Sequence, residues 1–271
     1  MEYLAGRATW LLWAPLVSLV ISLGLEYWIP LRTTLQNKLH HVSTNLTIAG
    51  VNAALVNFLF GGLYVAWTQS STAETWGLLN SLAFSPIGNL FASLFLLDLL
   101  GYGIHWAHHR ISVLWRFHRA HHSDLDLDAT TALRFHVGEA FITGGIRAIS
   151  LPLLGVSWVS LVVYEVTFQV LGLFSHSNFR LPEFVDRRIR ILLVSPQMHW
   201  LHHSRRPVEH NSNFGQIFSL WDRLLNTYHP PRTRDQIQVG LDEYPLPDHV
   251  SLMPFYAIPL GQACRSHSSD L

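Results

Sequence analysis

Cysteine and charged residues are both scarce in this sequence. A single cysteine, Cys264, stands among 271 residues. This excludes an internal disulfide framework, a thiolate zinc site and a cysteine-ligated iron–sulfur cluster within one chain. Charged residues make up 13 % of the chain, about half the share that covers an ordinary soluble domain. Eighteen basic residues balance eighteen acidic ones, so nothing supports a nucleic-acid partner held by bulk positive charge.

Long apolar runs take the place of the missing charge. Residues 8–25 contain no charged side chain, and the apolar run continues to Ile29 with Glu26 as its only interruption. Further runs at about 42–67 and 78–104 are also long enough to cross a bilayer. The sequence therefore predicts three transmembrane helices in its first 104 residues, the third of them broken near its start by Pro86 and Gly88.

A fourth apolar region, 140–174, is interrupted by charged residues and by Pro152 and Gly155. It predicts two short helices that form a hairpin, either spanning or re-entrant. The expected fold is an all-α integral membrane protein with about four to five transmembrane or re-entrant helices and a cytoplasmic histidine-rich helical cap. The expected division is into N-terminal membrane helices (1–97), a histidine-rich region (98–230) and a tail (231–271). Loop or partial disorder is expected in the tail after Tyr244.

Basic residues predict the orientation in the membrane. They follow the first and third apolar runs, whereas the segment between the second and third runs contains none. By the positive-inside rule, the histidine-rich segments lie on the cytoplasmic face. Because the hairpin returns the chain to the side it left, residues 105–138 and 175–271 are expected to share that face.

Histidine is the residue in excess: there are seventeen, and most of them lie between His105 and His210. One HxxxH pattern precedes two HxxHH patterns, which begin at His118 and His199. On a helix, positions three and four apart share a face, so each cluster is expected to aim two or three imidazoles in one direction. Four to six ligands saturate one ion, so eight or more converging histidines predict two ions held almost entirely by nitrogen. A zinc peptidase is excluded, because no HExxH string occurs.

Other polar residues extend these patterns. Asp98 and Tyr102 lie on the helical face of the HxxxH pair, and Asp98 is expected to orient an imidazole, with a simple polar helix end as the alternative. His108 lies off that face and is expected to support a ligand or to face an interface. His136 is a further candidate ligand or supporting residue. The remaining histidines lack a matching spacing and are expected in loops or interfaces: His40, His41, His210, His229, His249 and His267.

These strings resemble the fatty acid hydroxylase and sterol desaturase superfamily of integral-membrane non-haem di-iron oxygenases. The resemblance runs from about Asp98 to Tyr228 and rests on LWRFHRAHHSD at 114–124, DATTALRFH at 128–136, SPQMHWLHHS at 195–204 and NFG at 213–215, and it closes with SLWDRL at 219–224. It implies that 98–230 is the catalytic region. The metal ligands that it implies are His105, His109, His118, His121, His122, His199, His202 and His203, with His176 as a probable ninth.

The resemblance also implies a chemistry. Two iron ions bind and activate O2, and a C–H bond of a fatty acyl chain or sterol-like lipid from the bilayer is hydroxylated or desaturated. Zinc is expected to replace iron in purified protein, and activity is expected to fall in mild acid because ligation needs deprotonated imidazole. The chain has no H-P-G-G haem segment, so electrons come from a separate donor such as a cytochrome b5-like protein, a ferredoxin or a reductase. The oligomeric state is left open.

The sequence departs from the family pattern at three positions. Val137 stands where proline is usual, and Asn226 stands where glycine is usual. Gly172 stands where some members have a further histidine, which leaves the number of ligands open. Two alternatives remain: the same chemistry on a carotenoid, ether lipid or lipid head group, or a metal transporter with a histidine-rich loop. Transporters hold their ligands near the bilayer midplane, and loop histidines need no helical register.

Overall fold

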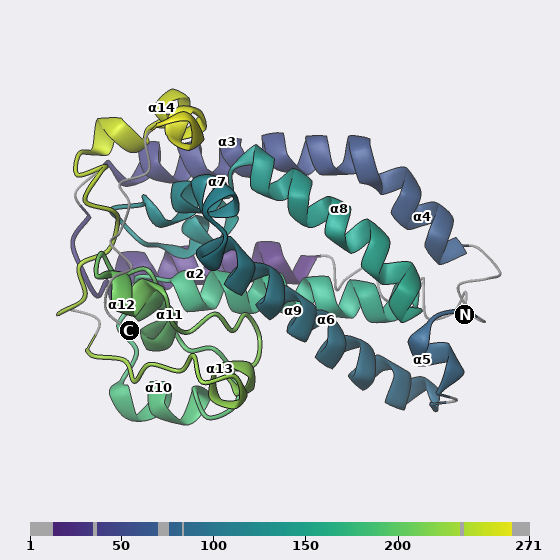
Figure 1. Ribbon diagram of the computed structural model, residues 1–271. Helices are drawn as coiled ribbons and strands as arrows, with labels where there is room; N and C mark the ends of the chain where they lie inside the picture. Colours follow the sequence, from purple (N-terminus) through teal and green to yellow (C-terminus); the bar gives the residue numbers. More distant parts are fainter. Residues whose placement is uncertain (1–12, 35–36, 70–75, 83, 234–235, 262–271) are drawn as a thin grey trace.

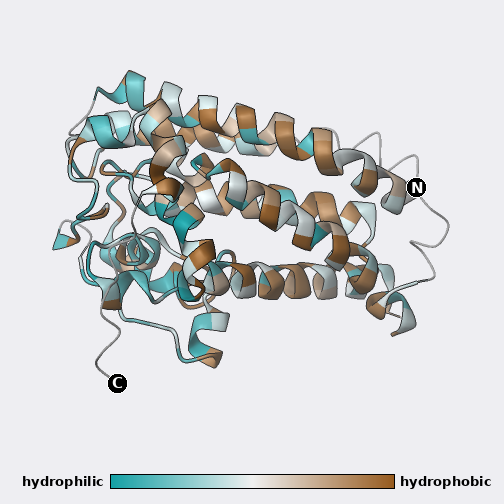
Figure 2. Cartoon of the chain, turned by 45° about the horizontal axis from the view of Figure 1, so that its top comes forward, coloured by the Kyte–Doolittle hydropathy of each residue, from teal (hydrophilic) through white to brown (hydrophobic). Residues whose placement is uncertain are grey.

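The computed structural model describes residues 13–34, 37–69, 76–82, 84–233 and 236–261. Long helices run side by side, and most of the short helices gather at one end of them, whereas α5 (Leu78–Ser81) lies at the other (Figure 1). The long helices are mostly apolar, whereas the end with the short helices is more hydrophilic (Figure 2). Within the described ranges there is no strand, only isolated bridges such as the one between Ser204 and Val239. The prediction of an all-α protein is confirmed.

Four helices in the described part of the chain are long and apolar enough to cross a membrane, which confirms a multi-pass membrane protein. The first is formed by α3 (Lys38–Val56), which continues through a wider π-helical turn (Asn57–Gly61) into α4 (Gly62–Gln69). The others are α6 (Pro86–Arg110), α8 (Val137–Leu154) and α9 (Trp158–His176).

The first apolar run is described only in part. Its described part is α2 (Ala14–Trp28), a helix of 15 residues, which at 1.5 Å per residue is about 22 Å long. Residues 1–12 lie outside the described ranges, so the predicted first transmembrane helix stays a prediction. Glu26, near the end of α2, is buried and forms an ion pair of 2.7 Å with Lys38. This ion pair ties α2 to the start of α3.

The third run is broken near its start, as predicted, whereas the fourth region differs from its prediction. The third run divides into α5 (Leu78–Ser81) and α6, and α6 begins at Pro86, where Ser85 caps it by accepting from Gly88 N at 3.2 Å. The hairpin does not consist of short helices, since α8 has 18 residues and α9 has 19. Between them, Gly155 takes a positive φ of 72° that lets the chain reverse tightly.

The long helices place the two histidine-rich segments at the same end. There α3 and α8 begin, and α6 and α9 end (Figure 1). The short helices of this cap are α7 (Ser112–His122), α10 (Glu183–Ile189), α11 (Pro196–His202), α12 (Pro207–His210), α13 (Leu220–Leu224) and α14 (Leu252–Ala257). The described parts of residues 105–138 and of the segment after 175 lie at the same end of the long helices, as expected of segments that share one face of the membrane.

Much of the tail is ordered, contrary to the expectation of loop. Residues 247–260 form α14 between two short 3-10 turns, and Phe255 is fully buried against Ile48 and Ala120. Arg119 of α7 donates to the carbonyl oxygens of Ile258 and Gly261 at 2.5 and 2.7 Å. The apolar stretch is too short to show a period in the sequence, so its packing could be found only in three dimensions. Residues 262–271, with Cys264 and His267, lie outside the described ranges.

Candidate metal centre

Nine histidines come together in two buried groups inside the cap. The five members of the first group have ligand atoms within 4.8 Å of one another, and so do the four members of the second. The first group is His105, His109, His118, His122 and His202, and the second is His121, His176, His199 and His203. The nine residues are those that the sequence proposed as metal ligands.

Each HxxHH pattern divides between the two groups. On α7, His118 and His122 belong to the first group, whereas His121 belongs to the second. The same holds around α11, where His202 joins the first group and its neighbours join the second. The rings of His122 and His203 stack across the boundary with centroids 4.5 Å apart. The expectation that each cluster aims two or three imidazoles in one direction is confirmed with two: positions i and i+4 share a group, and i+3 points to the other.

Hydrogen bonds fix the orientation of five of the nine rings through Nδ1. His105, His121, His176 and His202 donate from Nδ1 to the carbonyl oxygens of Phe214, Arg134, Gly172 and Ser212, at 2.7–3.2 Å. His118 donates from Nδ1 to Oε1 of Glu139 at 2.7 Å. A carbonyl oxygen only accepts, so the proton lies on Nδ1 and Nε2 keeps its lone pair. These bonds to outer partners hold metal-ligating rings in one tautomer.

The Nε2 atoms of the second group face one another. The separation is 3.3 Å between His121 and His176, 2.9 Å between His176 and His199, and 3.2 Å between His199 and His203. His121 and His176 both carry lone pairs at Nε2, so no hydrogen bond can join these two atoms. Ligand nitrogens about 2.0–2.1 Å from a metal ion in tetrahedral or octahedral geometry are themselves about 2.8–3.4 Å apart. The second group therefore fits one metal ion.

The first group fits a metal ion for a different reason. The Nε2 atoms of His109, His118, His122 and His202 are buried and have no hydrogen-bond partner among the described residues. Buried polar atoms without a partner are unfavourable by about 1–3 kcal/mol each. Four such atoms within one group of imidazoles are explained by a shared cation. All-nitrogen donor sets suit iron, zinc, copper and nickel.

Burial keeps the imidazoles of the cap neutral. It lowers the pKa of His118, His122 and His202 well below 6.5, and the neighbouring histidines lower it further. The pKa values of His121, His199 and His203 are lowered in the same way, first by burial. Metal binding needs the neutral ring, so these six side chains are ready to bind at neutral pH.

Four other candidates lie outside the two groups. Asp98 accepts from Ile217 N, Phe218 N and Trp221 Nε1 at 2.8–3.0 Å. The prediction that it orients an imidazole is therefore wrong, because the loop that folds over α6 takes both of its oxygens. Tyr102, His108 and His136 bind Thr227 Oγ1, Ile104 O and Gly138 N, respectively. His136 caps the start of α8.

The three departures from the family pattern have structural explanations. Val137 occupies the first turn of α8, where proline is also well accommodated. Asn226 has a φ of 56°, in the left-handed region that asparagine tolerates better than most residues. The carbonyl of Gly172 holds His176, and a Cβ at Gly172 would meet only Ala132, at 3.9 Å.

Two features near the site carried no recognisable signal in the sequence. The first is Glu139, which reaches His118 across 21 positions of the chain. The second is His41, which was expected in a loop or interface. It is buried between Asp124 and Asp128, with ring nitrogens 2.9 and 3.0 Å from their carboxylate oxygens. Lys38 also binds Asp128, at 2.6 Å. Neither HxxxH nor HxxHH spacing includes these residues, so only their proximity in the fold identifies them.

The positive charge of His41 lowers the pKa values of Asp124 and Asp128. Burial alone would raise the pKa of Asp124, but the charge of His41 and its hydrogen bond outweigh burial and lower this pKa to about 2. Burial is likewise outweighed at Asp128, where the hydrogen bond and charge of His41, together with Lys38, hold the pKa well below its usual range. The network ties the start of α3 to the segment that follows His122.

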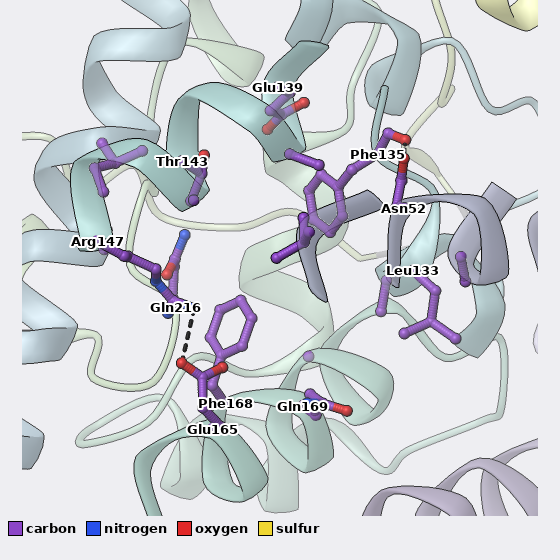
Figure 3. Close-up of a pocket in the computed structure, with 18 of the residues that line it drawn as sticks. Asn52, Leu133, Phe135, Glu139, Thr143, Arg147, Glu165, Phe168, Gln169 and Gln216 are labelled. Carbon is purple, nitrogen blue, oxygen red and sulfur yellow. Dashed lines mark hydrogen bonds and ion pairs between the residues drawn. The ribbon is translucent and has the colours of Figure 1, made fainter. Parts of the chain in front are cut away.

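A cavity of about 1120 Å³ leads from the histidines into the membrane-spanning helices. Five of the nine histidines line one end of it: His105, His118, His121, His176 and His199. Apolar side chains such as Leu133, Leu161 and Phe168 line much of the rest. Figure 3 shows part of this wall, with side chains from α8 and α9 on either side. The cavity is large enough for a lipid chain, since small-molecule pockets usually hold about 300–1,000 Å³.

Comparison with known proteins gives the same family as the sequence motifs. The family model of the fatty acid hydroxylases matches residues 90–227. The chain is 31 % identical over 146 residues to ornithine lipid hydroxylase OlsE of Rhizobium tropici, a match that covers 52 % of this chain and 42 % of the relative. It is 28 % identical over 205 residues to an alkylglycerol monooxygenase of Caenorhabditis elegans, a match that covers 73 % of this chain and 38 % of the relative.

A third relative, cholesterol 25-hydroxylase of Homo sapiens, is 29 % identical over 136 residues, a match that covers 49 % of this chain and 48 % of the relative. The matches thus span less than half the length of each of these three relatives. No solved structure matches the chain significantly. The family model covers just over half of the chain and contains all nine histidines of the two groups. This protein belongs to the fatty acid hydroxylase family.

Proposed function

We propose that this protein is a membrane-bound di-iron oxygenase that uses O2 and external electrons to hydroxylate a lipid. The observation that carries the proposal is that two buried histidine groups border a cavity of about 1120 Å³ in the membrane-spanning helices. The names of its relatives support a lipid substrate, because they refer to ornithine lipid, alkylglycerol and cholesterol. Desaturation of the same lipid is the alternative outcome.

Two iron ions held by the nine imidazoles would supply the activation of O2 and the oxidation of a C–H bond. The protein's part is to orient the ligands and to keep water out. Nδ1 donation fixes five of the rings, and burial keeps the rings of the cap neutral. The apolar cavity wall would hold an alkyl segment against the end of the cavity that the histidines line.

We further propose that the histidine cap lies on the cytoplasmic side of the membrane. At the cap end, Arg110, Arg116, Arg187 and Arg188 flank the long helices, whereas the described residues 76–82 and 155–157, at the opposite end, contain no lysine or arginine. In this orientation a lipid would reach the cavity from the bilayer. Electrons would arrive from the cytoplasm on a separate donor protein.

Metal analysis and isotope labelling test the proposal. Protein purified from iron-supplemented cells should contain two metal ions per chain, and the double variant His121→Ala/His202→Ala, which alters one ligand in each group, should lose both. His249→Ala is the matched control, because His249 is exposed and lies outside both groups. Purified protein that holds zinc agrees with the proposal, since zinc displaces ferrous iron at nitrogen sites.

The reaction is tested in membranes supplied with 18O2 and an electron donor. Hydroxylation would place one labelled oxygen atom in a lipid product, whereas desaturation would remove two hydrogen atoms and add no oxygen. Metal loading that is unchanged in the double variant, or the absence of any oxygen-dependent lipid product from metal-loaded protein, would overturn the proposal.

A further inference from the structure

The cavity contains an ion pair in its membrane-spanning part. Arg147 of α8 and Glu165 of α9 both line the cavity, and Nη1 of the arginine lies 2.8 Å from Oε1 of the glutamate (Figure 3). The two side chains are 23 % and 30 % exposed, so neither is sealed away from the cavity. Charged residues within membrane-spanning helices are rare and unfavourable, and they usually mark a functional site.

A role in bracing the hairpin does not explain this pair. Helix α8 packs mainly against α3, α4 and α7, whereas α9 packs against α2, α6 and α11. The cavity lies between α8 and α9, and the ion pair crosses it. Two apolar side chains would join helices in a bilayer without the desolvation that an ion pair requires. The position of the pair therefore points to a ligand in the cavity.

The charges at this point of the cavity cancel. The other polar side chains of the lining near Arg147 and Glu165 are uncharged: Thr143, Gln169 and Gln216. A carboxylate or phosphate would have to compete with Glu165 for the guanidinium and would leave one anion unpaired. A hydroxyl group both donates and accepts. It can therefore donate to Glu165 and accept from a further N–H of Arg147 while the ion pair stays intact.

The helices give the distance from this pair to the histidines. On α8, Glu139, which binds His118, precedes Arg147 by eight residues, or about 12 Å along the helix. On α9, Glu165 precedes His176 by eleven residues, or about 16 Å. A ligand anchored at the ion pair would therefore present to the histidines a carbon about 12–16 Å from its anchor.

We propose that Arg147 and Glu165 together bind the hydroxyl group of an uncharged lipid, and that this anchor selects both the substrate and the carbon that is oxidised. The inference rests on the proposed lipid oxidation at the histidine groups. The chemistry fits a long-chain primary alcohol or a sterol, since each carries one hydroxyl group at one end of a long apolar body. It does not fit a free fatty acid.

A competition experiment with metal-free protein in detergent tests this site. The probe is hexadecan-1-ol that carries a photoreactive diazirine, and the competitors are hexadecan-1-ol, cholesterol and hexadecanoate at pH 8.5. We expect hexadecan-1-ol or cholesterol to block labelling of α8 and α9 at a concentration at least about tenfold below the concentration of hexadecanoate that does so. Hydrogen bonds from a hydroxyl group to the charged side chains of Arg147 and Glu165 are strong enough to account for such a difference. Whichever of hexadecan-1-ol and cholesterol competes at the lower concentration shows whether the site binds a long-chain alcohol or a sterol. Equal competition by hexadecanoate would overturn the proposal.

Variants give the sharper test. Glu165→Gln leaves the guanidinium of Arg147 without its anion, so we expect the preference to move at least about tenfold toward hexadecanoate. The double variant Arg147→Met/Glu165→Leu has no unpaired charge but lacks both hydrogen-bond partners of the hydroxyl group. In this variant hexadecan-1-ol should compete only at a concentration at least about tenfold higher than in the wild type. Glu183→Gln, in the α10 ion pairs with Arg187 and Arg190, is the control and should keep the wild-type values. A wild-type ratio in Glu165→Gln, or wild-type competition by hexadecan-1-ol in the double variant, would overturn the proposal.

Binding and turnover separate this inference from the proposed function. A hydroxyl preference that depends on Arg147 and Glu165, in metal-loaded protein that forms no oxygen-dependent product, would overturn the oxygenase proposal and support the binding site. Lipid hydroxylation by a protein whose labelling shows no hydroxyl preference would support the oxygenase and overturn the binding site.

Discussion

Nδ1 of His118 donates to Oε1 of Glu139 across 2.7 Å, and this bond joins the first histidine group to α8. Glu139 therefore belongs both to the proposed metal centre and to the cavity wall. It orients a proposed metal ligand, and it lines the same cavity as Arg147, two helical turns farther along. The proposed metal centre and the cavity are thus held in register by one helix.

Replacing Glu139 should weaken the first metal site and leave the second intact. In Glu139→Leu the ring of His118 loses its acceptor, and loss of such a partner usually weakens metal binding by about 10–100-fold. Glu139→Gln keeps an accepting oxygen, so its loss should be smaller. Titration with a competing chelator measures both affinities. Equal weakening of both sites, or none, would contradict the assigned role, and Glu183→Leu on the surface serves as control.

Adjacent histidines should affect different ions. His202→Ala should remove the ion of the first group, and His203→Ala should remove the ion of the second, because the two residues belong to different groups. Each variant should retain about one metal ion per chain, measured by mass spectrometry, and the double variant none. His136→Ala should retain two, since His136 caps α8 and belongs to neither group. A loss of metal in His136→Ala would show that the ligand set is larger.

Truncating Phe255 should destabilise the cap without touching the metal sites. Its side chain is fully buried, and the guanidinium of Arg134 lies over its ring at 4.5 Å. Phe255→Ala should lower the free energy of unfolding by about 3–5 kcal/mol, seen as a lower Tm, with two metal ions still bound below the transition. Met253→Ala, at an exposed position of the same helix, should change the Tm little. An unchanged Tm in Phe255→Ala would show that this segment does not pack as described.

Asp128 should stabilise the protein at neutral pH and not in acid. Its pKa is held below the usual value despite burial, through the hydrogen bond and charge of His41 and through Lys38. Because the pKa is lower in the folded state, the stabilisation by the ionised Asp128 is complete above about pH 3.9, the pKa of an aspartate in the unfolded chain. This stabilisation is lost as the pH falls below that value. Asp128→Asn should therefore cost about 3 kcal/mol near pH 7.

The pH dependence is measured as the difference in Tm between the wild type and Asp128→Asn, which cancels the titration of groups common to both. The difference should narrow steadily below about pH 4. Asp242→Asn is the control, because Asp242 is 80 % exposed and lies 3.6 Å from its partner Arg205. A difference that stays constant from pH 7 to pH 3 would contradict the lowered pKa.

The sequence predicts the fold class and eight of the nine grouped histidines because both depend on local patterns. A run of about twenty apolar residues is visible without knowledge of its neighbours, and a spacing of three or four residues shows on one helix. His176 has no such spacing and was indicated only by the family resemblance. The bounds of the helices were harder to predict: hydropathy did not show that residues 252–257 form a packed helix, because this depends on contacts with distant segments.

The division of the histidines shows the same limit. Helical periodicity places His118, His121 and His122 near one another, but it does not show which ring faces which neighbour. That depends on where α6, α9 and α11 lie around α7. Asp98 was misread for a similar reason, since the backbone amides that it binds are 119 and 120 positions away. In the sequence, Arg147 and Glu165 are only the charged residues that interrupt the apolar region 140–174.

Both histidine groups combine residues from before and after the α8–α9 hairpin, and this determines when they can form during synthesis. The first group needs His202 in addition to four residues from 105–122, and the second needs His121 in addition to three residues from 176–203. Neither can be completed on a nascent chain until the hairpin has entered the membrane and α11 has left the ribosome. Loading of the proposed metal ions would therefore be a late step of biogenesis.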